Sequence, residues 1–224
     1  MTLKIDHLVV AADTLEQGIA YIEQQFSVQV PLGGVHPLMG THNCLMQAGD
    51  NMFFEIIAIN PQSLVDDALR IKHPRWFSLD DPLLRAQLKQ SPKLLTWLVN
   101  TQQFEETKKQ GIYRQTAAHL LSRNNLSWHF ALPLDGSLLA NGMLPYLLQW
   151  QGPNPAQTMP NKGCALEEIT IYHPQPQWIK EQLDTIGASH LVSINALQEP
   201  QSAFFEARFQ TPRGPVTLSS NTAG

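Results

Sequence analysis

The chain has 224 residues, of which 43% are hydrophobic and 15% are charged, and its formal net charge is -4 at pH 7. This composition suits one compact domain or two small ones, and the scattered Lys and Arg residues offer no basic surface for nucleic acid. The sequence contains no run of about 18 apolar residues, so we expect neither a membrane span nor a membrane partner. The N-terminus lacks the apolar centre of a signal peptide, so we expect a cytoplasmic protein.

The first predicted elements are a strand and a helix. Residues 4–11, KIDHLVVA, alternate and are rich in Ile, Leu and Val, which predicts a strand. Asp13 and Thr14 are good N-cap residues, and apolar residues then recur at helical spacing as far as Phe26. His7 therefore lies in an otherwise apolar strand, where a lone histidine is usually a core residue held by one hydrogen bond.

Three further strands are expected after this helix. SVQVPL predicts a short strand, GGVHPLMGT predicts a turn, and the stretches HNCLMQA and NMFFEIIAI, separated by GD, predict a tight hairpin. Residues 1–60 thus form a first module with the order βαβββ. Glu55 lies in the last of these strands, where a buried carboxylate needs a partner or water because an unpaired one is costly.

The same order recurs twice along the chain. Residues 61–92 predict a polar connector with a short helix, and residues 93–151 predict a second, less regular βαβββ-like module that contains the strands KLLTWLVN, LSWHFALP and LPYLLQW. Residues 152–164 are rich in Pro, Gly and Asn, which predicts a linker. Residues 165–224 predict a third βαβββ-like module packed in the same globule, so the chain contains an internal repeat. LEEITIY of this module aligns with IDHLVVA of the first, which places Glu168 beneath His7.

Several of these stretches resemble the glyoxalase-like domain family of the vicinal oxygen chelate superfamily. The resemblance is carried by IDHLVVAADTLEQGIAYI, GGVHPLMGTHNCLMQAGDNMFFEIIAI, HPRWFSL and LPYLLQW. It implies an α+β fold in which repeated βαβββ modules form curved mixed sheets around a cup. Enzymes of the superfamily hold a divalent metal in this cup, with ligands on the first and fourth strands of a module, and these positions correspond to His7 and Glu55.

An imidazole and a carboxylate together suit zinc, iron, manganese, nickel or cobalt. The second module departs from the ligand pattern, because the position aligned with His7 is Trp97 or, with a shift of one residue, Thr96. Gln149 lies near the position that corresponds to Glu55, and its amide oxygen is a poor but possible ligand. The resemblance thus implies a metal site for which half of the expected ligands are missing.

A glycine-rich stretch, GGVHPLMGTHN, contains three further candidates for substrate binding: His36, His42 and Asn43. One interpretation is that these side chains contact a substrate or supply a third metal ligand. The other is a turn in which the glycines allow the backbone to bend and the polar groups cap main-chain donors. If the strand is regular, His42 and Asn43 face opposite sides of the sheet.

Trp76, Trp128, Gln149 and Trp150 are the remaining candidates for substrate binding, since aromatic side chains could form the wall of an apolar pocket. His129 is a reserve metal ligand or a catalytic proton acceptor. The alternative is an ordinary one: tryptophans on strands are usually core residues, and a histidine on a strand is usually exposed or hydrogen-bonded within the core.

Two functions from different classes follow. The first is a metal-dependent lyase, isomerase or dioxygenase that acts on a small oxygenated molecule, in which Glu55 or His129 moves a proton. The second is a protein without metal or other cofactor that binds or sequesters a small molecule in the same cup. The third module could replace contacts that a second subunit would supply, which slightly favours a monomer over a homodimer.

Overall fold

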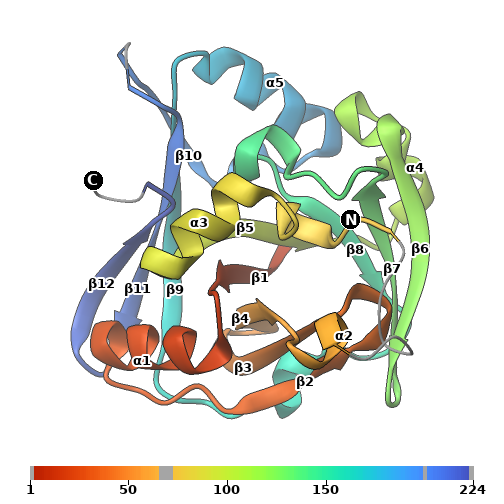
Figure 1. The fold of residues 1–224 in the computed structure, drawn as a ribbon. Helices are drawn as coiled ribbons and strands as arrows, with labels where there is room; N and C mark the ends of the chain where they lie inside the picture. Colours follow the sequence, from red (N-terminus) through yellow and green to blue (C-terminus); the bar gives the residue numbers. More distant parts are fainter. Residues whose placement is uncertain (1–2, 66–72, 199–200, 222–224) are drawn as a thin grey trace.

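The computed structural model describes residues 3–65, 73–198 and 201–221, which form two sheets with helices packed against them (Figure 1). The larger sheet has eight strands in the order β2-β3-β4-β1-β5-β8-β7-β6, and the smaller has four in the order β10-β9-β11-β12. The expected α+β fold with curved mixed sheets is confirmed. None of the helices in these three ranges is long and apolar enough to span a membrane.

The first module has the predicted order of elements. Its elements are β1 (Lys4–Ala11), α1 (Leu15–Phe26), β2 (Leu32–His36), β3 (Thr41–Gly49) and β4 (Met52–Ile59). The side chain of Thr14 accepts a hydrogen bond from the Gln17 amide and caps α1. The second strand was predicted at SVQVPL, which is wrong: it begins only at Leu32 and runs through the glycines that the sequence assigned to a turn.

The connector carries α2 (Gln62–Val65), a 3₁₀ turn (Trp76–Ser78) and α3 (Pro82–Gln90), and residues 66–72 of this prediction lie outside the described residues. The second module then follows with its helix and four strands. Its elements are β5 (Lys93–Asn100), α4 (Phe104–Lys108), β6 (Thr116–Arg123), β7 (Leu126–Pro133) and β8 (Tyr146–Trp150). The strand β6 was not predicted, because its largely exposed residues lack the apolar alternation of a half-buried strand.

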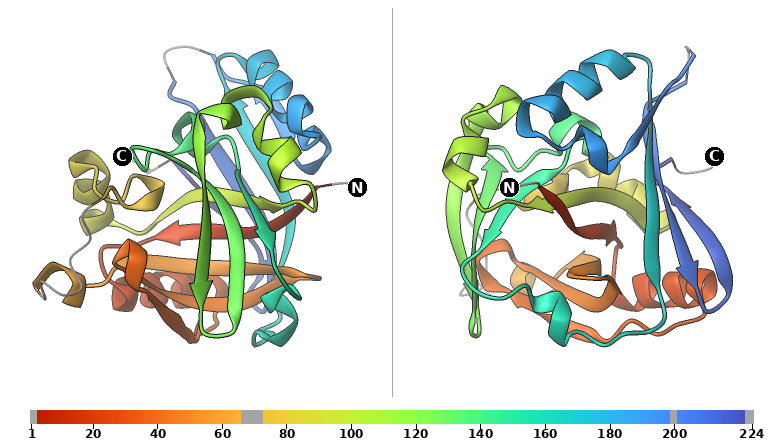
Figure 2. Two further views of the ribbon diagram at one scale, coloured as in Figure 1. Left: turned by 90° about the vertical axis from the view of Figure 1, so that its right-hand side faces the viewer. Right: turned by 180° about the vertical axis from the view of Figure 1, so that it is seen from behind.

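The first two modules join at the centre of the larger sheet. In each of these two modules the first strand pairs in parallel with the last, β1 with β4 and β5 with β8. The strands β1 and β5 pair antiparallel with each other. The sheet curls so strongly that its two edge strands approach (Figure 2). At this point Arg123 Nη1, at the end of β6, lies 3.1 Å from Nε2 of His36 at the end of β2.

The third module has the predicted order but a different pairing. It consists of β9 (Ala165–His173), α5 (Pro176–Ile186), β10 (Ser193–Ala196), β11 (Phe204–Thr211) and β12 (Gly214–Ser219). Here the first strand pairs in parallel with β10, which directly follows the helix, and antiparallel with β11. A strand that returns beside its predecessor after one helix is a βαβ crossover, so this module cannot form half of a cup like the other two.

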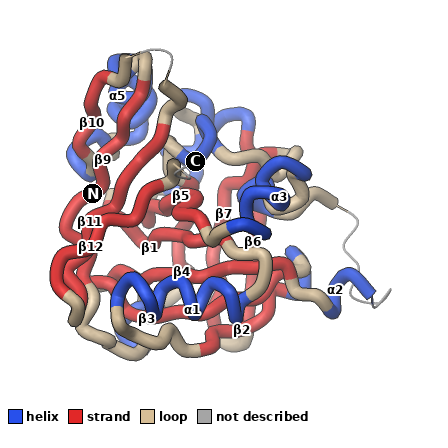
Figure 3. The backbone as a smooth tube through the Cα atoms, turned by 60° about the vertical axis from the view of Figure 1, so that its left-hand side comes forward, coloured by secondary structure: helices blue, strands red, loops and turns tan. Residues whose placement is uncertain are grey.

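The smaller sheet packs against the convex side of the first module (Figure 3). The ring of Phe209 on β11 lies 5.0 Å from that of Phe26 on α1 and 5.7 Å from that of Phe54 on β4. Buried residues from all three modules belong to one hydrophobic cluster. The segment predicted as a linker also packs, since the Gln47 amide on β3 donates to the carbonyl of Pro160 at 3.0 Å.

Candidate functional site

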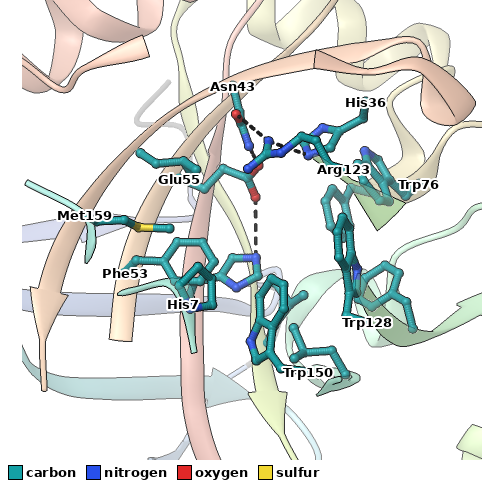
Figure 4. Close-up of a pocket in the computed structure, with 16 residues that line it drawn as sticks. His7, His36, Asn43, Phe53, Glu55, Trp76, Arg123, Trp128, Trp150 and Met159 are labelled. Atoms are coloured by element: carbon teal, nitrogen blue, oxygen red, sulfur yellow. Dashed lines mark hydrogen bonds and ion pairs between the residues drawn. The ribbon is translucent and has the colours of Figure 1, made fainter. Parts of the chain in front are cut away.

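A cavity opens on the concave face of the larger sheet, where the first two modules face each other (Figure 4). About 470 Å³ inside it is free of atoms, including the part that opens to solvent. One wall is polar and the opposite wall is mostly aromatic. The lining residues are His7, His36, Asn43, Leu45, Phe53, Glu55, Trp76, Phe77, Leu98, Arg123, Trp128, Phe130, Leu148, Trp150, Pro155 and Met159.

His7 lies on the polar wall between two buried carboxylates. Its Nδ1 is 2.7 Å from Asp6 Oδ1, and its Nε2 is 3.4 Å from Glu55 Oε2. Its ring stacks on that of Phe53 with 4.2 Å between the centroids. The pairing of β1 with β5 shifts between Ile5 and His7, and this bulge at Asp6 accompanies the unusual approach of two adjacent side chains.

Asp6 is fixed from its other side by residues far away in the sequence. Its Oδ2 accepts hydrogen bonds from Trp150 Nε1 at 2.8 Å and from Asn154 Nδ2 at 3.2 Å. Asn154 also donates to the carbonyl of Asn51 at 2.8 Å. The segment after β8, predicted as a linker, therefore holds the carboxylate that orients His7.

The electrostatics of this group favour a charged His7. Burial lowers the pKa of His7, but the hydrogen bonds from its ring to Asp6 and Glu55 outweigh burial and raise the pKa to about 9. Burial also raises the pKa of Glu55, yet the hydrogen bond and the charge of His7 lower it overall. At neutral pH His7 is thus an imidazolium that donates one N–H to Asp6 and directs the other at Glu55.

Asn43 connects Glu55 to the other end of the polar wall. Its Nδ2 donates to Glu55 Oε1 at 2.5 Å, and its Oδ1 accepts from Arg123 Nη1 at 3.2 Å. The Nη1 of Arg123 also contacts His36, whose Nδ1 lies 3.1 Å from Thr41 Oγ1. Burial lowers the pKa of His36 to about 4, so this ring is neutral and accepts the hydrogen bond from Arg123.

The two glycines of β2 make room for these side chains. A Cβ atom added at Gly33 would lie 2.4 Å from Asn43 Oδ1 and 2.9 Å from Leu45 Cγ. A Cβ atom at Gly34 would lie 3.3 Å from Arg123 Nη1. The backbone amide of Gly34 also donates to Asn43 Oδ1 at 2.9 Å. The GG pair of the sequence therefore shapes the cavity wall as part of a strand.

The aromatic wall comes from the connector and from β7 and β8. The rings of Trp128 and Trp150 lie 5.2 Å apart, and Trp76 meets Phe130 edge-on at 5.8 Å. The indole nitrogen of Trp76 is buried and has no hydrogen-bond partner in the described part of the chain. Such a wall suits a flat, apolar group, and it leaves one N–H donor unused.

The structure brings together most of the predicted site residues, but three of them lie outside the cavity lining. His42 is on the opposite face of β3 from Asn43, near α1, and burial lowers its pKa. His129 is on the opposite face of β7 from Trp128 and contacts the ring of Phe104 at 5.5 Å. Gln149, its partner on β8, donates to the carbonyl of Gln102 at 3.4 Å.

Among the lining or supporting residues that the sequence interpretation missed are Asp6, Arg123, Asn154 and Met159. Asp6 precedes His7 on a strand, and regular alternation would point its side chain to the opposite face. Arg123 belongs to the strand that was not predicted, and Asn154 and Met159 belong to the predicted linker. The Asn-Pro pair at 154–155, a common turn starter, was the one local signal of order there.

The second module supplies no usual metal ligand to the cavity. Leu98 pairs directly with His7 across β1 and β5, and Leu148 takes the same face of β8. Thr96 shares the face of Leu98, whereas Trp97 points to the other side and donates to the carbonyl of Met143 at 3.3 Å. Among the described residues, no group of three or more His, Cys, Asp and Glu side chains could hold a metal ion.

This donor set does not fit a resident metal of the kind that the resemblance implied. Catalytic zinc sites use three protein ligands, and within the described ranges the cavity brings together two candidates, His7 and Glu55. In the third module Glu168, aligned with His7, lies away from the cavity and bonds to Ser193 Oγ at 3.0 Å and to Arg208 Nη2 at 3.5 Å. The described residues thus offer two ligands where the pattern needs at least three.

Comparisons with known proteins agree with this fold. A family model described as a glyoxalase-like domain matches residues 5–187. A hypothetical protein from Staphylococcus aureus is 14% identical over 98% of this chain and 85% of that chain, with a TM-score of 0.56. At this identity the likeness shows the fold alone. No curated protein sequence matches the chain.

Two further solved structures are more distant. A mutant of 4-hydroxymandelate synthase from Streptomyces coelicolor is 10% identical over 97% of this chain and 62% of that chain, with a TM-score of 0.47. A methylmalonyl-CoA epimerase from the same organism, in complex with 2-nitronate-propionyl-CoA, is 13% identical over 69% of this chain and 99% of that chain, with a TM-score of 0.41.

Proposed function

We propose that this chain, which belongs to the glyoxalase-like domain family of the vicinal oxygen chelate superfamily, binds a small planar organic molecule in its cavity without a metal ion. The observation that carries the proposal is the pair Leu98 and Leu148 on the second module's side of the cavity. These apolar side chains face the His7 and Glu55 pair at the place where further ligands would be needed. They suit the carbon skeleton of an organic molecule instead.

The two walls of the cavity contact different parts of the ligand. A flat apolar group stacks against the aromatic wall that contains Trp128 and Trp150. The oxygen or nitrogen atoms of the ligand meet the polar wall, where Glu55 accepts hydrogen bonds and the Asn43 amide is held in one orientation by its neighbours. The hydrogen bond and the charge of His7 lower the pKa of Glu55, so this acceptor is ionised before the ligand arrives.

A metal-dependent lyase, isomerase or dioxygenase is the second candidate, and one observation favours it. The 3.4 Å between His7 Nε2 and Glu55 Oε2 is compatible with two ligands of one ion, and a carboxylate behind a ligating histidine, as Asp6 lies here, is common at metal sites. A divalent metal would supply a Lewis acid there. It would need its remaining ligands from water or substrate.

Ligand binding by the full chain in the presence of EDTA tests the proposal. Small aromatic acids, amides and alcohols are titrated and followed by ligand-observed NMR. Met159→Trp enlarges a half-buried residue of the cavity lining, and Leu120→Trp makes a similar change on the outer side of β6, where Leu120 is 64% exposed. We expect binding without metal that Met159→Trp weakens about tenfold or more and that Leu120→Trp leaves unchanged, a difference of about 1.4 kcal/mol.

Either of two results contradicts the proposal. One is that no compound binds until a divalent ion is added, which would favour the metal-dependent candidate. The other is that binding is equally strong in both tryptophan variants, which would place the bound molecule outside this cavity.

A further inference from the structure

Arg123 is a cation in the cavity wall that has no anionic partner among the described residues. It is half-buried at the end of β6, beside Gly34 of β2. In the described part of the chain its hydrogen bonds all use Nη1 and go to two neutral acceptors, Asn43 Oδ1 and His36 Nε2, and it forms no salt bridge. The Nε–H and the two Nη2–H groups are left without partners among these residues. A partly desolvated guanidinium in this state favours an anion that comes from outside.

Asn43 keeps the charges of the polar wall apart. Its amide nitrogen faces Glu55, and its amide oxygen faces Arg123 (Figure 4). Because the side chain stands between a carboxylate and a guanidinium, the two opposite charges do not pair with each other. Glu55 instead pairs with His7, whose ring lies on the far side of it. At its His7 end the wall holds one imidazolium and two carboxylates, so this end is negative overall, and its other end is cationic at Arg123.

The surroundings of Arg123 add two features that suit an anionic, aromatic ligand. His36 is neutral and adds no second charge, so the attraction at this end comes from Arg123 alone. Trp76, which contacts His36 edge-on at 4.9 Å, is also a lining residue, and its buried indole N–H has no partner among the described residues. A guanidinium and an indole N–H at one end of an aromatic wall are both donors.

The geometry points to Arg123 as the residue that binds a carboxylate group of the ligand, with the aromatic part of the ligand against the tryptophan wall. This inference rests on the proposed function and deepens it, because it names the ligand class as small aromatic carboxylates. The planar guanidinium can bind a carboxylate through two parallel N–H donors, which a lysine cannot do. Glu55 repels the same group, so the ligand binds in one orientation.

Arg123 also joins the two edges of the curled sheet through its hydrogen bonds to His36 and Asn43. The test must therefore distinguish a structural role of Arg123 from a role in ligand binding. Benzoate, phenylacetate and 3-phenylpropionate are each paired with the corresponding primary amide, which has nearly the same shape and no charge. Each pair is titrated into the full chain in EDTA and followed by ligand-observed NMR. The variants are Arg123→Gln, Arg123→Lys and, as a control for one lost charge, Arg114→Gln at an exposed arginine outside the cavity lining.

We expect the wild type to bind the carboxylates about tenfold more tightly than the amides. We expect Arg123→Gln to remove this preference and to change amide binding by less than about threefold. Arg123→Lys should keep part of the preference for carboxylates, and Arg114→Gln should keep all of it. A preference that survives in Arg123→Gln overturns the inference, as does an equal loss of acid and amide binding, which would make Arg123 a structural link only. Amides that bind as tightly as acids to the wild type overturn it too. If no compound binds, the proposed function itself fails.

Discussion

The first and third modules share the same order of elements and differ in what they build. In the first, β1 pairs with the last strand and turns His7 into a cavity that both halves of the larger sheet line. In the third, β9 pairs with the strand after the helix, and the aligned Glu168 lies at the surface in contact with Arg208. The periodicity of a sequence sets which residues share a face, but it does not set which strands become neighbours.

This contrast divides the molecule into a part that forms the site and a part that supports it. The cavity is lined by residues of the first two modules and of the segment after β8, and none of the lining residues comes from β9 to β12. The smaller sheet instead packs through Phe209 on the convex side of the first module. We therefore expect substitutions in the third module to change stability without changing ligand recognition.

The largest expected effect is at the contact between the two sheets. Phe209→Ala removes a fully buried ring that contacts Phe26 and Phe54, and we expect it to lower the free energy of unfolding by about 3–5 kcal/mol. Phe204→Ala, on the same strand but half-buried and stacked on Tyr172, should cost about 1 kcal/mol. Urea unfolding measures both, and equal losses would contradict the assigned packing of β11.

The aligned acidic positions of the two modules should differ almost as much. Asp6→Ala removes a fully buried carboxylate that accepts hydrogen bonds from Trp150 and Asn154 and leaves the His7 imidazolium with one partner fewer. We expect a loss of about 3 kcal/mol, because the buried donors of His7, Trp150 and Asn154 are left without their acceptor. Glu167→Ala, at the aligned position on the surface, should change stability by less than about 0.5 kcal/mol. Comparable values in urea unfolding would show that Asp6 is not held as described.

The pH dependence of stability should come from the first module. The pKa of His7 is raised from 6.5 to about 9 in the folded chain, so its contribution is complete below about pH 6.5 and is lost as the pH rises through about 9. We expect the free energy of unfolding to fall by about 2–3 kcal/mol over this range. His7→Gln should flatten the profile and Glu168→Gln should leave it as it is. A wild-type profile without this fall would contradict a charged His7.

The smallest expected effect is at the glycines of β2. Gly33→Ala places a methyl group against Asn43 Oδ1 and Leu45, so we expect a loss of about 1–2 kcal/mol and weaker ligand binding. Gly152→Ala is the matched control, because a Cβ atom there meets nothing within 4 Å. Thermal unfolding and NMR titration measure the two effects. An alanine at position 33 that changes neither would contradict the assigned position of Asn43.

The fold was largely predictable because apolar alternation and helix capping are local signals. The three first strands, β1, β5 and β9, follow directly from such patterns. The exposed edge strand β6 carries no such pattern, and the crossover of the third module depends on contacts between distant residues. Both were missed for that physical reason.

The site was predictable in part. The resemblance assigned His7 and Glu55 to ligand positions on the first and fourth strands of a module, and the structure puts His7 Nε2 3.4 Å from Glu55 Oε2. Asp6 was missed because a bulge interrupts the alternation of side chains on β1, and Arg123 because its position depends on the curl of the sheet. A bulge and a curl both arise from tertiary structure, and neither has a signature in the residues concerned.

Metal content tests the central claim most directly. The protein is purified without an affinity tag, incubated with zinc, iron, manganese, nickel or cobalt ions, dialysed and analysed by mass spectrometry beside His7→Ala and Glu55→Ala. We predict that the wild type holds far less than one equivalent of any metal and no more than the two variants, because the described part of its cavity supplies two protein ligands where a metal site needs at least three. One equivalent of metal in the wild type that is lost in both variants would contradict the account.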